Sequence, residues 1–167
     1  MITLELALAE ELEIYTRIID AGRAFQQEQG FVQWTEDYPN AAILQQDIQN
    51  SKGYVVRVDG KVAGYMYIDF DGEPAYAHIE GAWQTPDSYA VVHRMALDPA
   101  FRGIGLTGTV FALIEALCRE KGIPSIRVDT DFPNKRMQHI LEKYGFVQRG
   151  VIYFQGGGKL AYDKMVD

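Results

Sequence analysis

The first fifty residues show two kinds of hydrophobic pattern. Ile2 to Ala7 alternates apolar and polar positions, which is typical of a half-buried strand. From Glu10 to Gln29 the apolar residues recur at helical spacing, and Ala41 to Ile48 predicts a shorter helix that ends before Gly53. The N-terminal third is therefore predicted to run from a strand into two helices.

The next segment alternates apolar and polar residues again, which predicts strands. Tyr54 to Val58 and Lys61 to Phe70 flank Asp59-Gly60, a dipeptide that favours a two-residue hairpin turn because it tolerates positive φ angles. Two further strands are predicted at Ala75 to Trp83 and Tyr89 to Leu97. Neighbouring strands joined by short turns favour antiparallel pairing.

The hydrophobic period changes to that of helices in the last third of the chain. Thr107 to Lys121 and Asn134 to Tyr144 are predicted helices, and Ser125 to Asp129 is a predicted strand between them. Phe146 to Phe154 and Leu160 to Val166 are predicted as the final strands. The order strand, helix, strand makes a βαβ unit within an otherwise antiparallel arrangement.

The length of 167 residues, 47% of them hydrophobic, suggests one globular domain over residues 1–167. We expect an α+β fold whose mixed, mostly antiparallel sheet has six or seven strands flanked by helices. No stretch reaches the roughly 18 apolar residues of a membrane span, and the first residues lack the basic segment of a signal peptide. The single Cys118 cannot form an internal disulfide. We therefore expect a cytoplasmic protein without a membrane partner.

The charges are distributed unevenly. The net charge is −7, which argues against nucleic acid as a partner because binding its backbone requires excess Lys and Arg. Residues 1–93 hold 5 basic and 15 acidic residues, whereas residues 94–149 hold 9 basic and 6 acidic ones. An anionic ligand is therefore expected to favour the later segment, although the same charges also suit an ordinary solvated surface.

A glycine-rich segment from Arg102 to Gly108 lies between a predicted strand and a predicted helix. The free backbone N–H groups of a helix start favour an anion, so this segment is a candidate phosphate site. Gly103, Gly105 and Gly108 also fit G-x-G-x-x-G, with Asp129 about twenty residues later, as in a dinucleotide-binding unit. Against that alternative, several residues separate the strand from the first glycine, and too little chain follows for a doubly wound sheet.

The residues resemble the GNAT superfamily of acetyl-CoA-dependent N-acetyltransferases. The family signature, Arg/Gln-x-x-Gly-x-Gly/Ala, is matched by Arg102 to Thr107, except that Thr107 replaces the last small residue. The resemblance is also carried by Gln33-Trp34, Tyr38-Pro39-Asn40, Asp47-Ile48, Val92-His93-Arg94, Asp129-Thr130 with Asn134, and Lys143-Tyr144-Gly145-Phe146. It implies a GNAT-like sheet that is splayed between the fourth and fifth strands, near Tyr89 to Leu97 and Ser125 to Asp129, where the cofactor enters.

The resemblance also implies a set of cofactor contacts. The backbone of Met95, Ala96 and Leu97 would pair with the pantetheine arm of acetyl-CoA like an added strand. The loop that would hold the pyrophosphate comprises Arg102, Gly103, Ile104, Gly105, Leu106, Thr107 and Gly108. Asn134 resembles the position that contacts the cofactor arm, although a residue of that type after Pro133 is also an ordinary helix N-cap.

Acetyl transfer to an amine requires a neutral nucleophile and a proton for the departing thiolate. Tyr144 is the candidate acid by resemblance, and the alternative is an aromatic side chain packed in the core. His93 and Glu80 are candidate bases, and His93 shares a strand face with Met95. Cys118 has no adjacent base, which favours direct attack by the amine over a covalent acyl-enzyme.

We therefore expect transfer of an acetyl group from acetyl-CoA to a primary amine on a small molecule or peptide, without a metal. The acidic first half favours a cationic acceptor, and Trp34, Tyr38 and Trp83 are candidate walls of its pocket, with burial in the core as the alternative. Two other functions stay open, a non-catalytic acyl-CoA-binding sensor and an NAD-binding oxidoreductase. A homodimer is left open as well.

Overall fold

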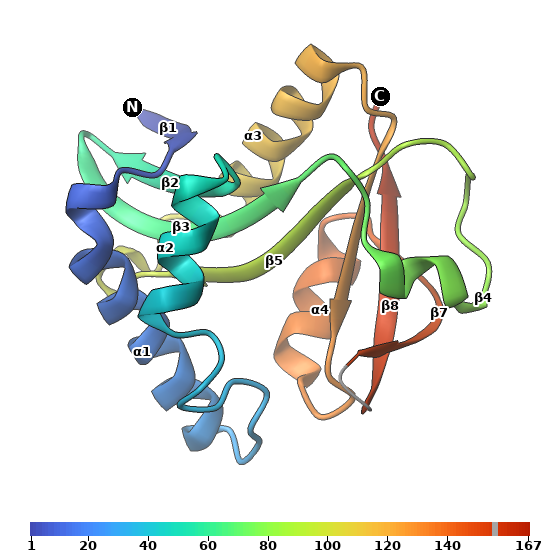
Figure 1. The fold of residues 1–167 in the computed structure, drawn as a ribbon, viewed down its shortest axis with the longest axis horizontal. Helices are drawn as coiled ribbons and strands as arrows, with labels where there is room; N and C mark the ends of the chain where they lie inside the picture. Colours follow the sequence, from blue (N-terminus) through green and yellow to red (C-terminus); the bar gives the residue numbers. More distant parts are fainter. Residues whose placement is uncertain (155–156) are drawn as a thin grey trace. The chain divides into compact units, whose positions relative to one another are not determined.

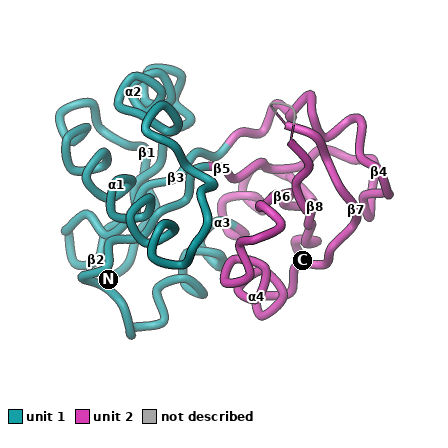
Figure 2. Tube along the Cα trace, turned by 90° about the horizontal axis from the view of Figure 1, so that it is seen from below, with its two compact units in different colours: residues 1–68, 94–114 teal, residues 69–93, 115–167 magenta. Residues whose placement is uncertain are grey.

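The computed structural model describes residues 1–154 and 157–167. These residues form two compact units, which we call unit 1 and unit 2 (Figure 2). Unit 1 comprises Met1–Ile68 and Arg94–Ile114, and unit 2 comprises Asp69–His93 and Glu115–Asp167. Each unit is thus built from two separate stretches of chain.

The sheet of unit 1 begins with an antiparallel meander. Strand β1 (Ile2–Leu6) pairs with β2 (Gly53–Val58), and β2 pairs with β3 (Lys61–Asp69). The turn between β2 and β3 has positive φ at both Asp59 and Gly60, 50° and 84°, which confirms the predicted hairpin. After β3 in the strand order comes β5 (Ala90–Leu97), whose last four residues belong to unit 1.

Two helices supply the rest of the core of unit 1. Helix α1 (Leu12–Glu28), preceded by the short η1 (Ala9–Glu11), lies beside α2 (Ala41–Gln49) (Figure 1). The side chain of Asn40 accepts a hydrogen bond from the backbone of Ile43, which explains where α2 begins. The buried core cluster comprises Ala7, Tyr15, Ile18, Ile19, Trp34, Leu44, Val55, Tyr65 and Ala96. Both predicted helices are therefore confirmed.

The sheet of unit 2 combines one parallel pair with antiparallel ones. The start of β5 pairs in parallel with β6 (Ser125–Thr130), and this register comprises Ala90↔Ile126 and Val91↔Arg127. Antiparallel pairs join β6 to β8 (Gly157–Met165), β8 to β7 (Val147–Phe154), and β7 to β4 (Glu80–Gly81). The short β5–β6 ladder lies at the place where the sequence predicted that the sheet opens.

The predicted strand at Ala75 to Trp83 is wrong for most of its length. Instead, a short helix η2 (Pro74–His78) forms, with Pro74 in its first turn, and only Glu80–Gly81 is a strand. The Tyr76 side chain is fully buried in the core of unit 2, and the indole of Trp83 donates a hydrogen bond to the Tyr76 carbonyl. Burying Tyr76 in this way takes the segment out of the sheet.

Three more helices complete the described chain: η3 (Pro99–Phe101), α3 (Leu106–Lys121) and α4 (Lys135–Lys143). The strands of the described residues follow the order β1-β2-β3-β5-β6-β8-β7-β4, so the sheet has eight strands where six or seven were expected. The fold is α+β with a mixed, mostly antiparallel sheet, as predicted. It is not the parallel, doubly wound sheet that the dinucleotide-binding alternative requires.

Candidate functional site

The glycine-rich loop of unit 1 is exposed and leads directly into a helix. Residues Arg102 to Gly105 are exposed, and α3 begins at Leu106. Gly103 and Gly105 have φ angles of +84° and +70°, in the left-handed region that side chains disfavour, and no atom lies within 4 Å of a Cβ built on either. The loop therefore presents open backbone at a helix start, which is the geometry of an anion site.

The backbone before this loop is anchored to β3 within unit 1. The amide of Asp98 donates to the carbonyl of Ala63 at 2.7 Å, and its carboxylate accepts from Ala100, which fixes the start of η3. Ala96 is buried in the core of unit 1, whereas Met95 and Leu97 are half-buried. The three residues that the resemblance links to the pantetheine arm thus lie on one short stretch of β5.

A cluster of polar side chains surrounds His93 in unit 2. The His93 Nε2 atom lies 3.4 Å from Glu73 Oε1, and Nδ1 lies 3.7 Å from Asp129 Oδ2. The hydroxyl of the fully buried Tyr76 donates to the same Asp129 oxygen at 2.6 Å. Burial and the neighbouring Asp129 carboxylate raise the pKa of Tyr76 well above its ordinary value, so its hydroxyl stays protonated and remains a donor.

The sequence did not link two members of this cluster to His93. Glu73 lies in a turn-rich segment between β3 and η2, where no spacing links it to His93. Asp129 was named in the dinucleotide-binding alternative, because it follows the glycine loop by about twenty residues, and also in the family resemblance, but neither linked it to His93. The available signal was that Asp129 and His93 lie on β6 and β5, which are neighbouring strands in the sheet.

Glu80, the other candidate base, lies elsewhere in unit 2. It is exposed in β4, and its Oε2 atom accepts a hydrogen bond from the Tyr153 hydroxyl at 3.0 Å. This bond raises the pKa of Tyr153. The carboxylates beside His93 are therefore Glu73 and Asp129, and Glu80 is engaged with a surface tyrosine.

Tyr144 and Asn134 lie at the two ends of α4 in unit 2. Tyr144 is the C-cap residue and is half-buried, and the ammonium of Lys143 lies 5.5 Å from the centre of its ring. Asn134 is buried and its Oδ1 atom accepts a hydrogen bond from the Met137 amide at 3.1 Å. Asn134 thus caps the helix, which is the alternative that the sequence left open.

The three aromatic residues suggested as walls of an amine pocket are already engaged with other groups. Trp34 is buried in the core of unit 1, as the alternative expected. Tyr38 accepts a hydrogen bond from Arg94 at 3.0 Å. In unit 2 the Arg127 guanidinium lies 4.4 Å from the Trp83 ring centre. The contacts of these three residues are with other parts of the protein, which weakens the hypothesis that they wall an amine pocket.

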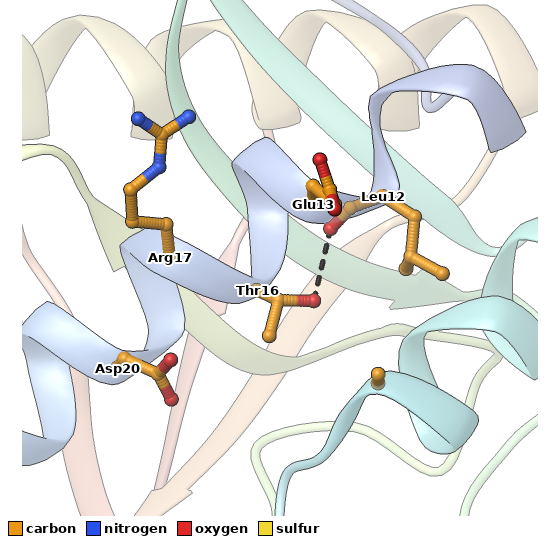
Figure 3. Close-up of a pocket in the computed structure, with 6 residues that line it drawn as sticks. Leu12, Glu13, Thr16, Arg17 and Asp20 are labelled. Atoms are coloured by element: carbon orange, nitrogen blue, oxygen red, sulfur yellow. Dashed lines mark hydrogen bonds between the residues drawn. The ribbon is translucent and has the colours of Figure 1, made fainter.

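A surface groove of about 540 Å³ lies on unit 1 (Figure 3). Its lining comprises Leu12, Glu13, Thr16, Arg17, Asp20 and Ala41. The Thr16 hydroxyl donates to the carbonyl of Leu12 at 2.9 Å, so it is occupied within α1. None of the site residues expected from the sequence lines this groove.

Three further findings concern Cys118, metal ions and membrane spans. Cys118 is fully buried, and burial raises the pKa of its thiol to about 11, so it is protonated near neutral pH. Over residues 1–154 and 157–167 no group of three or more His, Cys, Asp or Glu side chains could hold a metal ion. Within the same residues no helix is long and apolar enough to cross a membrane.

Comparisons with known proteins agree on one family. The model of the Acetyltransferase (GNAT) family matches residues 19–146. A crystal structure of a GNAT-family acetyltransferase from Streptococcus agalactiae is 34% identical, with 99% of this chain and 96% of that chain covered and a TM-score of 0.89. No curated protein matches the chain.

More distant structures share the fold. A GNAT-family acetyltransferase from Listeria monocytogenes is 21% identical, with 98% and 94% of the two chains covered and a TM-score of 0.75. The aminoglycoside acetyltransferase AAC(6')-Ib, solved in complex with coenzyme A and kanamycin, is 20% identical, with 99% and 95% covered and a TM-score of 0.70.

Proposed function

Because this chain belongs to the GNAT acetyltransferase family, we propose that it transfers an acetyl group from acetyl-CoA to a primary amine. The observation that carries the proposal is the exposed loop at the start of α3, where Gly103 and Gly105 leave backbone N–H groups open to a pyrophosphate. The coenzyme A complex of AAC(6')-Ib, a protein of the same fold, supports the choice of donor.

In unit 1 the cofactor contacts would be made mainly by backbone. The segment from Arg102 to Gly108 would hold the pyrophosphate, with Arg102 adding a positive charge. The peptide groups of Met95, Ala96 and Leu97 would hydrogen-bond the amides of the pantetheine arm. Side chains at Gly103 or Gly105 would hold the phosphates away from the loop, so the open space there suits this ligand.

In unit 2 the acid–base groups are His93 and Tyr144. His93 would accept the proton that the amine nitrogen loses as it attacks the thioester carbonyl, and the carboxylates of Glu73 and Asp129 would stabilise the imidazolium. Tyr144 would donate its proton to the sulfur as the carbon–sulfur bond breaks. The products are an amide and free coenzyme A, so protons and electrons balance without an acyl-enzyme.

The loop is tested by a pair of glycine variants that share the same backbone strain. Gly105 and Gly122 have φ angles of +70° and +69°, and both are open to solvent around the Cβ position. We expect Gly105→Val to weaken coenzyme A binding at least tenfold by calorimetry, because a side chain there blocks the phosphate. Gly122→Val, at the far end of α3, is expected to bind coenzyme A as the unmodified protein does.

The reaction is tested by measuring thiol release from acetyl-CoA across a panel of primary amines that includes kanamycin, polyamines, amino acids and short peptides. Turnover with at least one amine supports the proposal. Binding of coenzyme A with no turnover across the panel would favour the acyl-CoA sensor instead. Binding of NAD in place of coenzyme A would favour the oxidoreductase.

A further inference from the structure

Arg94 has a strained backbone inside a strand. Its φ angle is +53°, a left-handed value that costs conformational energy for any residue with a side chain. Among the described residues, Ser51 and Asp59 are the other non-glycine residues with positive φ, and both lie in turns next to β2. Arg94 lies within β5, where no turn requires such a value, so something else must hold it there.

The side chain of Arg94 is held by a buried network in unit 1. Its Nε and Nη2 atoms donate to the two oxygens of Asp47 at 3.0 and 2.7 Å. Its Nη1 atom donates to the Tyr38 hydroxyl at 3.0 Å, and its guanidinium carbon lies 4.3 Å from the Tyr67 ring centre. The Tyr65 hydroxyl completes the network by donating to Asp47 at 2.7 Å. We call Arg94, Asp47 and Tyr38 the β5 clamp.

The ion pair of the clamp is largely buried and its charges balance. Side-chain exposure is 10% for Arg94 and 7% for Asp47, so both lie in a low dielectric where a two-pronged ion pair is strong. Burial, together with the Asp47 carboxylate, raises the pKa of Tyr65, so its hydroxyl remains a donor. Removing the charge of Asp47 would leave a buried guanidinium without its counterion, which favours release of the strained backbone.

The strained residue immediately precedes the backbone proposed to bind the pantetheine arm. One left-handed residue in a strand changes the direction in which the following peptide groups point. On the other side of Met95 to Leu97, the amide of Asp98 is anchored to Ala63 at 2.7 Å. The orientation of the three peptide groups between Arg94 and Asp98 is therefore set at both ends. The β5 clamp holds one end, and the hydrogen bond from Asp98 to Ala63 holds the other.

We propose that Asp47 is a positioning residue, which acts through Arg94 to aim the peptide groups of Met95 to Leu97 at the pantetheine arm. The inference rests on the proposed function, because it assigns a use to the same stretch of β5. Asp47 itself touches no substrate in this scheme. A residue of α2 thereby controls how well the donor binds.

The primary test is Asp47→Asn, which keeps the size of the side chain and removes its charge. We expect the Kd for coenzyme A and the KM for acetyl-CoA to rise about tenfold, with kcat changing less than threefold. The matched control is Asp163→Asn in unit 2, because Asp163 is also buried and accepts from an arginine, Arg149, at 2.8 Å. The control is expected to lower thermal stability and leave the Kd unchanged.

A milder variant covers the case in which Asp47→Asn does not fold. Tyr38→Phe removes one hydrogen bond to Arg94 and leaves the ion pair in place, so we expect the Kd for coenzyme A to rise about threefold. Asp47→Asn decides the outcome if it folds, and otherwise Tyr38→Phe does. If that variant binds coenzyme A as before and only its melting temperature falls, the proposal is overturned.

Amide hydrogen exchange separates this inference from the proposed function. In protein without coenzyme A, Asp47→Asn is expected to speed exchange at Met95 to Asp98, and Asp163→Asn is not. Unchanged exchange there overturns the positioning role. If the unmodified protein binds no coenzyme A, the proposed function fails and the assigned use of the clamp fails with it, but faster exchange would still show that Asp47 holds the strand.

Discussion

His93 shows how little a single residue reveals before its neighbours are known. The sequence identified it by its chemistry and its strand position, but both of its ring nitrogens prove to face carboxylates, those of Glu73 and Asp129. Glu73 and Asp129 lie 20 and 36 positions from His93 along the chain, so the sequence alone does not show that they meet. The role of His93 as a base stays a prediction, and the two neighbouring carboxylates are what the structure adds to it.

Tyr144 is expected to act only when charge develops on the sulfur. We predict that Tyr144→Phe lowers kcat by about 10- to 1000-fold and leaves the affinity for acetyl-CoA within a few-fold, because one general acid is lost and no ground-state contact is. Steady-state kinetics at saturating acetyl-CoA and amine measure this. The control is Tyr153→Phe, an exposed tyrosine bonded to Glu80.

A different outcome for Tyr144→Phe would change its assignment. If kcat is unchanged while the melting temperature falls, the ring is a packing residue at the end of α4 and the proton comes from elsewhere. Tyr153→Phe is expected to change neither kcat nor the affinity for acetyl-CoA.

Cys118 is predicted to be unreactive in the folded protein. Its side chain is fully buried and the pKa of its thiol is raised to about 11, so at pH 8 only about one thiol in a thousand is ionised. We expect iodoacetamide to label the native protein at least 100-fold more slowly than protein in denaturant. Mass spectrometry follows a single site, because the chain has one cysteine. Rapid labelling of native protein would instead make a covalent intermediate at Cys118 worth testing.

At the scale of secondary-structure elements, the sequence predicted correctly the elements that depend on residues close together in the chain. Helices α1 and α2 and the β2–β3 hairpin follow from hydrophobic period and from the Asp59-Gly60 turn, which act over a few residues. The segment from Ala75 to Trp83 was predicted wrongly because the burial of Tyr76 among distant residues such as Ile152 decides its course. Strand alternation cannot show such a contact.

The residues of the candidate site also divide into those that are consecutive in the sequence and those that are far apart in it. The glycine loop was visible as a motif because its residues are consecutive. Glu73 and Asp129 belong to the His93 cluster although 56 positions separate them, and Asp47 reaches Arg94 across a separation of 47. Such pairs leave no period or spacing in one sequence, so the structure was needed to find both the cluster and the β5 clamp.

An ion pair between η1 and β2 predicts how unit 1 responds to acid. Glu11 accepts two hydrogen bonds from Arg57, at 3.0 and 2.6 Å, and these lower the pKa of Glu11. Because the folded pKa lies below the unfolded one, the ionised form adds stability above the unfolded pKa, about 4.3. That contribution is lost as the pH falls through the folded pKa.

We therefore expect Glu11→Gln to be less stable than the unmodified protein at pH 7 and to lose less stability between about pH 5 and 3. Thermal melts over that range measure the difference. Glu13→Gln serves as the control because Glu13 is exposed in the next turn, and its melts are expected to follow those of the unmodified protein. Parallel curves for Glu11→Gln and the unmodified protein would show that the pair adds no pH-dependent stability.

At the scale of the whole molecule, the charge distribution predicts how ionic strength affects the donor. Coenzyme A is a polyanion, and the segment 94–149 carries a net charge of +3 in a chain whose net charge is −7. Screening shortens the reach of these charges, since the Debye length falls from about 10 Å at 0.1 M salt to about 3 Å at 1 M. Attraction by this basic segment should therefore weaken as salt rises.

We predict that the Kd for coenzyme A rises about fivefold between roughly 0.05 and 0.5 M KCl. Calorimetry across the series measures it. Arg102→Ala should bind more weakly at low salt and show a shallower dependence, because one charge at the proposed phosphate site is gone. A Kd independent of salt would mean that backbone contacts alone hold the cofactor.

The interleaving of the two units has a consequence for how the protein is made. A chain emerges from the ribosome in order, but unit 1 needs both Met1–Ile68 and Arg94–Ile114, and the stretch Asp69–His93 that emerges between them belongs to unit 2. The nascent chain must therefore carry that stretch, including the aromatic Tyr76, without its final neighbours until Glu115–Asp167 is complete. During synthesis the aromatic residues of this stretch lack their final neighbours, and we expect a chaperone to bind there.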